Sequence, residues 1–135
     1  MIRICIADPD SSTRNALTLL LRGRFETDGI TEVEDVESLI RHLADAPPDL
    51  LLLDWRLYGS PAPETCILLQ RAFPKLTIVL LSVDAGDADA ARRAGAIFVH
   101  KGASPEELVA TLKPLFRIES SSRSLSKSGL PLRGE

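Results

Sequence analysis

Four polar side chains stand at or near the ends of short apolar runs and could act together as a reactive site. They are Asp8 after IRICIA, Asp54 after LLLL, Ser82 after LTIVLL and Lys101 shortly after AIFV. Each alone has a plainer interpretation, as a carboxylate that ends a strand, a satisfied hydroxyl or a solvated loop lysine. The combination of two acids, a hydroxyl and a lysine is what indicates a site.

The chemistry of this set follows from its charges. Two carboxylates that lie close together repel each other, and a hard divalent cation such as Mg²⁺ relieves that repulsion. A carboxylate can also attack phosphorus and form an acyl phosphate. A metal ion and a lysine stabilise the negative charge of the transferred group, and a serine hydroxyl can hydrogen-bond one of its oxygens. The residue types therefore favour phosphoryl transfer to a carboxylate, provided that the fold brings them together.

The segment Asp49 to Asp54, DLLLLD, is the element around which the others must be arranged. Four consecutive leucines predict a strand that is buried on both faces, which is typical of a parallel sheet covered by helices. Pro47 and Pro48 block a helix just upstream. Asp54 is then expected at the carboxyl end of a central strand, the edge where ligands bind in open α/β sheets.

The rest of the chain alternates between strand and helix patterns. Apolar runs predict further strands at residues 2–7, 30–33, 76–81 and 96–99. Helical patterns follow Ser11 and Ser12, which offer caps, and recur at residues 36–43, 64–73, 84–94 and from Ser104 onward. We therefore predict an α/β fold, a doubly wound five-stranded parallel sheet in the flavodoxin-like order 2-1-3-4-5 with helices on both faces. This order brings the four polar strand ends to one edge.

The carboxyl-terminal part differs from the rest in composition. Pro114 removes a helical hydrogen bond, so an end or kink of the last helix is expected near Lys113. From Glu119 onward the chain is serine-rich and has no apolar periodicity. We expect a folded domain over residues 1–118 and a disordered serine-rich tail over residues 119–135.

Composition excludes several classes of function. The 135 residues have a net charge of −3, so direct binding to nucleic acid or to an anionic membrane is not expected. The amino terminus reaches an acid too early for a signal peptide, and no apolar run is long enough to span a membrane. Cys5 and Cys66 are far apart and are expected to be buried free thiols in a reducing compartment, which favours a cytoplasmic location.

The sequence resembles the receiver domains of two-component response regulators over about Ile2 to Phe116. The matching pieces are IRICIADPD, PDLLLLDWRL, LTIVLLS, AGAIFVHKG and SPEELVATL. Together these pieces are specific, whereas each alone is weak. The resemblance is closest to receivers that are often joined to helix-turn-helix output domains. No such domain fits behind the last helix, so a stand-alone receiver-like domain is expected over residues 1–118.

The resemblance implies a role for each matching residue. Asp54 is implied as the phosphoacceptor, and Ser82 and Lys101 as contacts of the phosphoryl group. Asp8, Asp54 and the backbone carbonyl of Arg56 are implied as Mg²⁺ ligands. Phe98, three residues before the lysine, matches the aromatic switch residue of the family. It can also serve as plain core packing.

Several positions depart from the family pattern. Pro9 replaces the second of two adjacent acids, which usually supplies a direct metal ligand, so the resemblance leaves Mg²⁺ affinity open. Asp10 matches a non-ligand position. Gly102 follows the lysine where proline is frequent, and Val83 follows Ser82 where a smaller residue is usual. Arg56 and Asp84 occupy the two positions that tune phosphoryl lifetime, and an ion pair between them is a hypothesis.

The function that the resemblance implies is a signalling switch, not an enzyme with turnover. Asp54 would take a phosphoryl group from a histidine kinase or phosphotransfer protein, and the changed surface would bind an unknown output protein or another copy of the chain. A degenerate receiver that binds partners without phosphorylation is the main alternative, supported by Pro9. A more remote one is a haloacid dehalogenase-like phosphatase that uses Asp8 in Asp8-Pro9-Asp10, which would leave Asp54 without a role.

Overall fold

A computed structural model of the chain describes the backbone of residues 1–57 and 62–128, and side chains as far as residue 116 within those ranges. Five parallel strands form one sheet in the order β2-β1-β3-β4-β5. The strands are β1 (Ile2–Ala7), β2 (Thr27–Val33), β3 (Leu50–Asp54), β4 (Thr77–Ser82) and β5 (Ile97–His100). The predicted fold class and strand order are confirmed.

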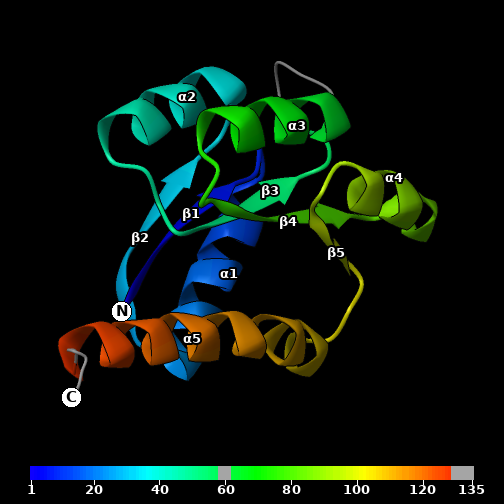
Figure 1. The fold of residues 1–135 in the computed structure, drawn as a ribbon. Coiled ribbons are helices and arrows are strands. Elements are labelled where there is room, and N and C mark those ends of the chain that lie inside the picture. The colour runs from blue at the N-terminus through cyan, green and yellow to red at the C-terminus, as the bar shows by residue number, and fades with distance from the viewer. Residues whose placement is uncertain (58–61, 129–135) are drawn as a thin grey trace.

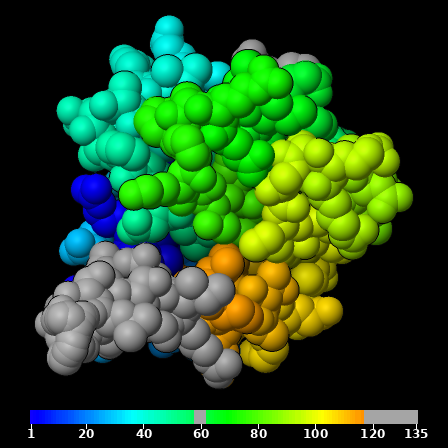
Figure 2. All heavy atoms as spheres, viewed as in Figure 1, coloured from blue at the N-terminus to red at the C-terminus, as the bar shows by residue number. Residues whose placement is uncertain are grey.

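Helices cover both faces of the sheet, as Figure 1 shows. They are α1 (Ser11–Arg24), α2 (Val36–Asp45), α3 (Ala62–Ala72), the 3₁₀ turn η1 (Ala85–Asp87), α4 (Ala88–Arg93) and α5 (Pro105–Ser128). α1 and α5 lie on one face, and α2, α3 and α4 lie on the other. Figure 2 shows that α4 lies at an outer edge of the molecule, next to β5 in the chain.

The central strand explains why two helical layers are needed. Every residue of β3 is buried. Leu50 and Leu52 belong to the core beneath α1 and α5, whereas Leu51 and Leu53 belong to the core beneath α2, α3 and α4. Because burying one leucine side chain stabilises a fold by about 1.5–3 kcal/mol, a strand of alternating leucine faces requires cover on both sides. This burial fixes Asp54 at the carboxyl edge of the sheet.

Two elements differ in length from their sequence patterns. β2 begins at Thr27, before the expected residue 30, because an edge strand can pair through its backbone while several of its polar side chains remain in solvent. The predicted helix over residues 84–94 is divided into η1 and α4. The Asp84 side chain accepts a hydrogen bond from the Gly86 N–H at 2.8 Å, which stabilises a tight turn before α4 begins.

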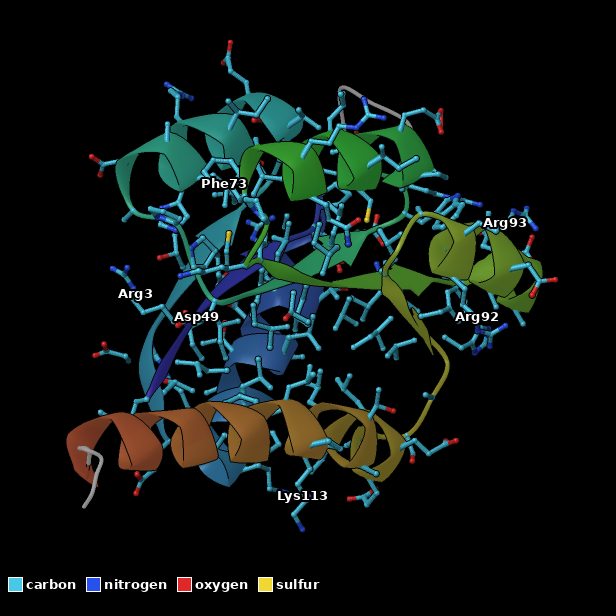
Figure 3. All side chains as sticks on the ribbon, viewed as in Figure 1. Arg3, Asp49, Phe73, Arg92, Arg93 and Lys113 are labelled. Atoms are coloured by element: carbon cyan, nitrogen blue, oxygen red, sulfur yellow. The ribbon has the colours of Figure 1, made fainter. Side chains whose placement is uncertain are left out.

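The last helix is longer than expected. α5 passes through Pro114 without ending there, so of the predicted end or kink near Lys113 the end is wrong and the kink stays a prediction. The buried side chains of Leu108 and Leu112 hold the helix on the sheet and offset the lost hydrogen bond. In Figure 3, Lys113 points away from the sheet, on the opposite side of the helix.

The helical backbone of α5 continues to Ser128, past the expected boundary at residue 118. Extending an existing helix fixes one residue for each hydrogen bond gained, so a serine-rich sequence can continue a helix that it would not start. Residues 129–135 lie outside the described residues, and the division into a domain and a tail stays a prediction.

Candidate functional site

The carboxyl edge of the sheet brings together the polar strand ends that the sequence singled out. Asp8 follows β1, Asp54 ends β3 and Ser82 ends β4, and these side chains are only 2–5% exposed. Lys101 follows β5, and its Nζ lies 2.8 Å from Asp8 Oδ2 and 2.6 Å from Asp54 Oδ1. One ammonium group therefore joins two buried carboxylates from neighbouring strands.

The charge of Lys101 is stabilised where it stands. Burial alone lowers the pKa of a lysine, but the hydrogen bonds that Lys101 donates to Asp54 and Asp8, together with the charges of the two carboxylates, outweigh that effect. The pKa of Lys101 consequently lies above its ordinary value. With one cation and two anions, the cluster keeps a net negative charge and can bind a further cation.

Backbone N–H groups orient both carboxylates. The Asp10 N–H donates to Asp8 Oδ1 at 2.8 Å, and the Arg56 N–H donates to Asp54 Oδ2 at 2.9 Å. Each carboxylate thus has one oxygen held by the chain just after it and the other held by Lys101. The Arg56 backbone is at the site, although the contact that the structure gives is its N–H and not its carbonyl.

Ser82 has a partner that sequence reasoning missed. Its hydroxyl donates to Asp87 Oδ2 at 2.6 Å and accepts from the Asp84 N–H at 3.1 Å. Asp87 ends the short turn η1, five residues beyond the serine. The sequence signal for this contact is an acidic residue in the first turn after a strand that ends in a serine. In this conformation the serine proton is bound to Asp87, away from the carboxylate of Asp54.

The residues between β1 and α1 have structural roles. The Asp10 carboxylate caps α1 by accepting from the Thr13 N–H and the Thr13 hydroxyl, so Ser11 and Ser12 are not the cap that the pattern offered. Those hydrogen bonds, led by the Thr13 hydroxyl, hold the pKa of Asp10 below its usual value. Arg14, also missed from sequence, donates through Nη1 to the Asp8 backbone carbonyl at 2.6 Å.

The donor atoms at the edge suit a hard cation in type and number. Mg²⁺ sites in proteins use one or two carboxylates and complete their shell with water and phosphate oxygens. Asp8 and Asp54 converge on a single cationic atom, so they meet this minimum. Among the described residues, no group of three or more acid, histidine or cysteine side chains is arranged to hold a metal ion. Pro9 occupies the place where a third carboxylate is missing.

A cavity of about 210 Å³ opens beside these groups. Its lining comprises Asp8, Pro9, Asp10, Asp54, Trp55, Arg56, Ser82, Val83 and Lys101. Val83 is 59% exposed and narrows the opening next to Ser82. A small anion can therefore reach the two acids and the lysine from solvent.

The structure also places Phe98, Arg56 and Asp84, for which the sequence suggested a switch role and an ion pair. Phe98 is half-buried, packs against the core beneath α2, α3 and α4, and is not among the described residues that line the cavity. An ion pair between Arg56 and Asp84 does not occur in the described part of the chain. Asp84 instead binds the Gly86 N–H, because a neighbouring amide is closer than a side chain on another loop.

Residues 4–113 match the family described as response regulator receiver domain. The match covers most of the chain and includes every residue of the edge cluster. The chain belongs to the response regulator receiver family. Acceptance of a phosphoryl group by an aspartate in two-component signalling is the function of this family. The family is one of signalling switches and not of conventional enzymes.

Curated relatives agree with this assignment. The phosphate regulon transcriptional regulatory protein PhoB of Klebsiella pneumoniae is 32% identical over 122 residues, which cover 85% of this chain and 52% of that protein. The DNA-binding response regulator MtrA of Mycolicibacterium smegmatis is 35% identical over 119 residues, which cover 85% of this chain and 50% of that protein. This chain spans about half the length of these relatives.

Solved structures share the fold. A two-component response regulator of the LuxR family from Aurantimonas sp. SI85-9A1 matches with a TM-score of 0.78 and 22% identity, covering 87% of this chain and 86% of that chain. The response regulator DrrB of Thermotoga maritima matches with a TM-score of 0.76 and 21% identity, covering 88% of this chain and 54% of that chain. Within the described residues, no helix is both long and apolar enough to cross a membrane.

Proposed function

We propose that Asp54 is the phosphoacceptor of this receiver and that it takes the phosphoryl group from a phosphohistidine of a kinase or phosphotransfer protein. The observation that carries the proposal is the bridge from Lys101 Nζ to Asp54 Oδ1 and Asp8 Oδ2, beside a solvent-open cavity. A carboxylate that is buried, held by a lysine and still reachable by a small anion suits in-line attack on phosphorus.

The residues of the chain divide the reaction between them. An oxygen of Asp54 bonds to phosphorus, the bond from phosphorus to the donor nitrogen breaks, and the donor imidazole leaves. Lys101, already 2.6 Å from Asp54, balances the negative charge on the transferred oxygens. The Arg56 N–H orients the attacking carboxylate. Ser82 is the hydroxyl that can contact the acyl phosphate once it leaves Asp87.

Mg²⁺ is part of this proposal, with Asp8, Asp54 and the Arg56 backbone carbonyl as its protein ligands. When bound, the ion supplies positive charge that reduces the repulsion between the carboxylates and the incoming phosphate. Because Pro9 offers no side-chain oxygen, we expect weaker Mg²⁺ binding than a site with three acids would give.

The proposed switch begins at Ser82. Once the serine turns toward the acyl phosphate, the hydrogen bond to Asp87 is lost and η1 is released from the end of β4. Phe98, half-buried beside Ala91 and Ala94 in the same core, can then repack toward the vacated space. The surface of α4, β5 and α5 changes in consequence, and an output protein or a second copy of the chain would bind it.

A second cavity of this chain, next to the site, is suited to bind the phosphodonor protein. A cavity of about 400 Å³ lies between α1 and α5 and is lined mainly by apolar side chains, among them Leu17, Leu20 and Leu108. Lys101 belongs to the lining of both cavities. An amphipathic helix that packs there can present a phosphohistidine to Asp54, which supports a helical histidine kinase or phosphotransfer domain as the donor.

The free thiols support a cytoplasmic location as a further part of the proposal. Cys5 and Cys66 are both buried and unpaired. Burial raises the pKa of Cys5 to about 12 and the pKa of Cys66 to about 11, which keeps both thiols protonated and unreactive. Structural thiols of this kind are typical of reducing compartments.

A degenerate receiver that binds partners without phosphorylation is the second candidate. One observation favours it, since Pro9 removes a metal ligand and leaves Lys101 as the charge that pairs the two acids. The haloacid dehalogenase-like alternative gains no support, because the Asp10 carboxylate is engaged in capping α1.

The experiment that tests the proposal is the intact mass of the chain after incubation with Mg²⁺ and acetyl phosphate. We expect one added phosphoryl group in the wild type and none in Asp54→Ala. The absence of an adduct at high Mg²⁺ and with a phosphohistidine donor would favour the degenerate receiver. Pro9→Asp then distinguishes the cause, since restored labelling would assign the failure to the missing carboxylate.

A further inference from the structure

His100 links the two loops that carry Ser82 and Lys101. Its ring nitrogen Nε2 lies 2.9 Å from the backbone carbonyl oxygen of Val83, the residue after Ser82. Its other ring nitrogen, Nδ1, accepts a hydrogen bond from the Gly102 N–H at 3.2 Å, on the residue after Lys101. The imidazole is exposed, yet both of its nitrogens are engaged by backbone groups of the site loops.

These two contacts define a single protonation state of the ring. The Gly102 N–H can only donate, so Nδ1 must carry a lone pair. The Val83 carbonyl can only accept, so Nε2 must carry the hydrogen. The contacts are thus satisfied by the neutral Nε2–H tautomer. A second proton on Nδ1 would face the Gly102 N–H and abolish that hydrogen bond.

Gly102 is shaped for this contact. A Cβ atom at this position would lie 2.7 Å from Cε1 and 3.0 Å from Nδ1 of His100, so any other residue would displace the ring. Proline, which the resemblance leads one to expect here, would also lack the N–H that donates. Glycine supplies both the donor and the space, so the histidine and the glycine fit together as a pair.

We propose that neutral His100 is a positioning residue that holds the Ser82 and Lys101 loops together, and that protonation of its ring releases them and slows phosphoryl transfer to Asp54. The inference deepens the proposed function and rests on it for the effect on transfer. His100 touches neither the acids nor the cavity beside Asp54, although it lines the larger cavity between α1 and α5. It acts on Ser82 and Lys101 through the backbone beside each of them.

The charged groups around the ring favour release at low pH. On α5, the Glu107 carboxylate accepts a hydrogen bond from the Ser104 N–H at 3.0 Å. This hydrogen bond is the main reason why the pKa of Glu107 lies below its usual value, and the charge of His100 contributes a smaller part. Lys101 turns its ammonium toward Asp8 and Asp54. Asp84 and Asp87, on the Val83 side, are bound to the Gly86 N–H and the Ser82 hydroxyl. Glu107 is therefore an acid close enough for its charge to interact with a protonated ring.

The direction of the effect follows from the charge of the ring. A ring that carries a second proton cannot accept the Gly102 N–H, so the clamp is present when the ring is neutral and is lost when it is protonated. After protonation of the ring, the contacts through His100 are lost. The hydrogen bond from the Lys101 N–H to the Ser82 carbonyl still joins the two segments.

The structural part of the proposal is tested by NMR on the full ¹⁵N-labelled chain without metal or phosphodonor. At about pH 8 we expect the Nε2–H tautomer of His100, and amide shifts of Gly102, Ser82 and Lys101 that follow the titration of the ring. In His100→Gln, which can donate and accept but cannot titrate, these amide shifts should no longer depend on pH. An Nδ1–H tautomer, or amide shifts that ignore the ring titration, would overturn the proposal.

The functional part is tested by the rate at which acetyl phosphate and Mg²⁺ label Asp54, followed by intact mass. Between about pH 7.5 and 5.5 we expect the wild-type rate to fall about fivefold more than the rate of His100→Gln or Gly102→Ala. His42→Gln, which changes the other histidine of the chain on α2, should follow the wild type. Superimposable profiles of wild type and His100→Gln would refute the positioning role. If no variant is labelled, the proposed function fails, and the amide shifts alone decide on the clamp.

Discussion

Lys101 carries the charge balance of the site. Within the described part of the chain, Lys101 is the cation that forms ion pairs with both Asp8 and Asp54. Its side chain remains 20% exposed. Two carboxylates on adjacent parallel strands would repel each other without it. The same ammonium therefore stabilises the resting fold and stands ready to balance an incoming phosphoryl group.

The raised pKa of Lys101 predicts a loss of stability at high pH. Because the folded value lies above the ordinary 10.5, the stabilising contribution is fully present below about pH 10.5 and is lost as the pH rises through the folded value. We expect the difference in free energy of unfolding between wild type and Lys101→Met to shrink across that range. At neutral pH the free energy of unfolding of the variant should be lower by about 1–3 kcal/mol. This is less than the cost of breaking a fully buried ion pair, because the Lys101 side chain is partly exposed to solvent.

Chemical denaturation at several pH values measures both effects. Lys113→Met is the matched control, since Lys113 points away from the sheet on α5 (Figure 3) and should keep a constant difference from wild type. A Lys101→Met difference that stays constant through the alkaline range would contradict the assignment.

Asp87 competes with the phosphoryl group for Ser82. The hydrogen bond of 2.6 Å to a carboxylate is of the strong, charge-assisted kind, and it must break before the serine can contact an acyl phosphate. Asp87→Ala removes this competitor and a nearby negative charge. We therefore expect phosphorylation of Asp54 to become about three- to tenfold faster, which corresponds to part of the about 1.5–3 kcal/mol that a hydrogen bond to a charged group contributes.

The initial rate of labelling by acetyl phosphate checks this prediction. Asp89→Ala is the control, because Asp89 lies two residues further along the chain, on α4, and pairs with Arg92 in solvent. An Asp87→Ala rate equal to or below that of wild type would show that Ser82 is not restrained by this contact.

At the level of the elements, the amino end of α5 is fixed by a reciprocal cap. The Ser104 N–H donates to Glu107 Oε1 at 3.0 Å, and the Glu107 N–H donates to Ser104 Oγ at 3.2 Å. Such a reciprocal pair of hydrogen bonds is a capping box. Ser104 lies two residues after Gly102 and α5 begins at Pro105, so the cap also anchors the loop that carries Lys101.

Ser104→Ala should lower the free energy of unfolding by about 0.5–2 kcal/mol, because one amide of the first turn loses its partner. Ser12→Ala is the control, since Asp10 and not Ser12 caps α1, and its effect should stay within about 0.5 kcal/mol. Thermal or urea denaturation of both variants provides the measurement. Equal destabilisation by the two substitutions would argue against the capping box.

At the scale of the whole molecule, the two helical layers seal the sheet. Cys5 on β1 and Cys66 on α3 are completely buried within the core beneath α2, α3 and α4. Phe25, which follows α1, and Phe116 on α5 stack on the opposite side with ring centroids 4.0 Å apart. The two layers therefore enclose the sheet on both of its faces.

Burial of both thiols predicts that they resist modification in the native state. With a pKa of about 12 for Cys5 and about 11 for Cys66, each gains reactivity only when the core opens. We expect labelling by a thiol reagent to be slow in buffer and complete in denaturant, with a Cys66→Ser variant reporting Cys5 alone. Rapid labelling of native Cys5 would mean that the layer opens locally.

Sequence patterns were sufficient for the sheet and for the placement of polar strand ends along one of its edges. The leucine run that ends at Asp54 predicted a doubly covered strand, because a strand with two apolar faces has no stable place at a surface. The β/α alternation then left few possible orders, and parallel strands place their carboxyl ends at one edge. Because Asp8, Ser82 and Lys101 stand at or just after strand ends, their position at that edge could be predicted as well.

Contacts between loops depended on the tertiary structure. Local sequence patterns do not predict three of the observed features: the partner of the Ser82 hydroxyl, the tautomer of His100 and the passage of α5 through Pro114. Each of these depends on which neighbouring groups the folded chain brings into contact. Sequence by itself determined which residues end the strands, because burial of apolar runs is a local and strong preference. Only the folded chain decided which polar groups bind one another, because hydrogen bonds and ion pairs depend on distances between segments far apart in the sequence.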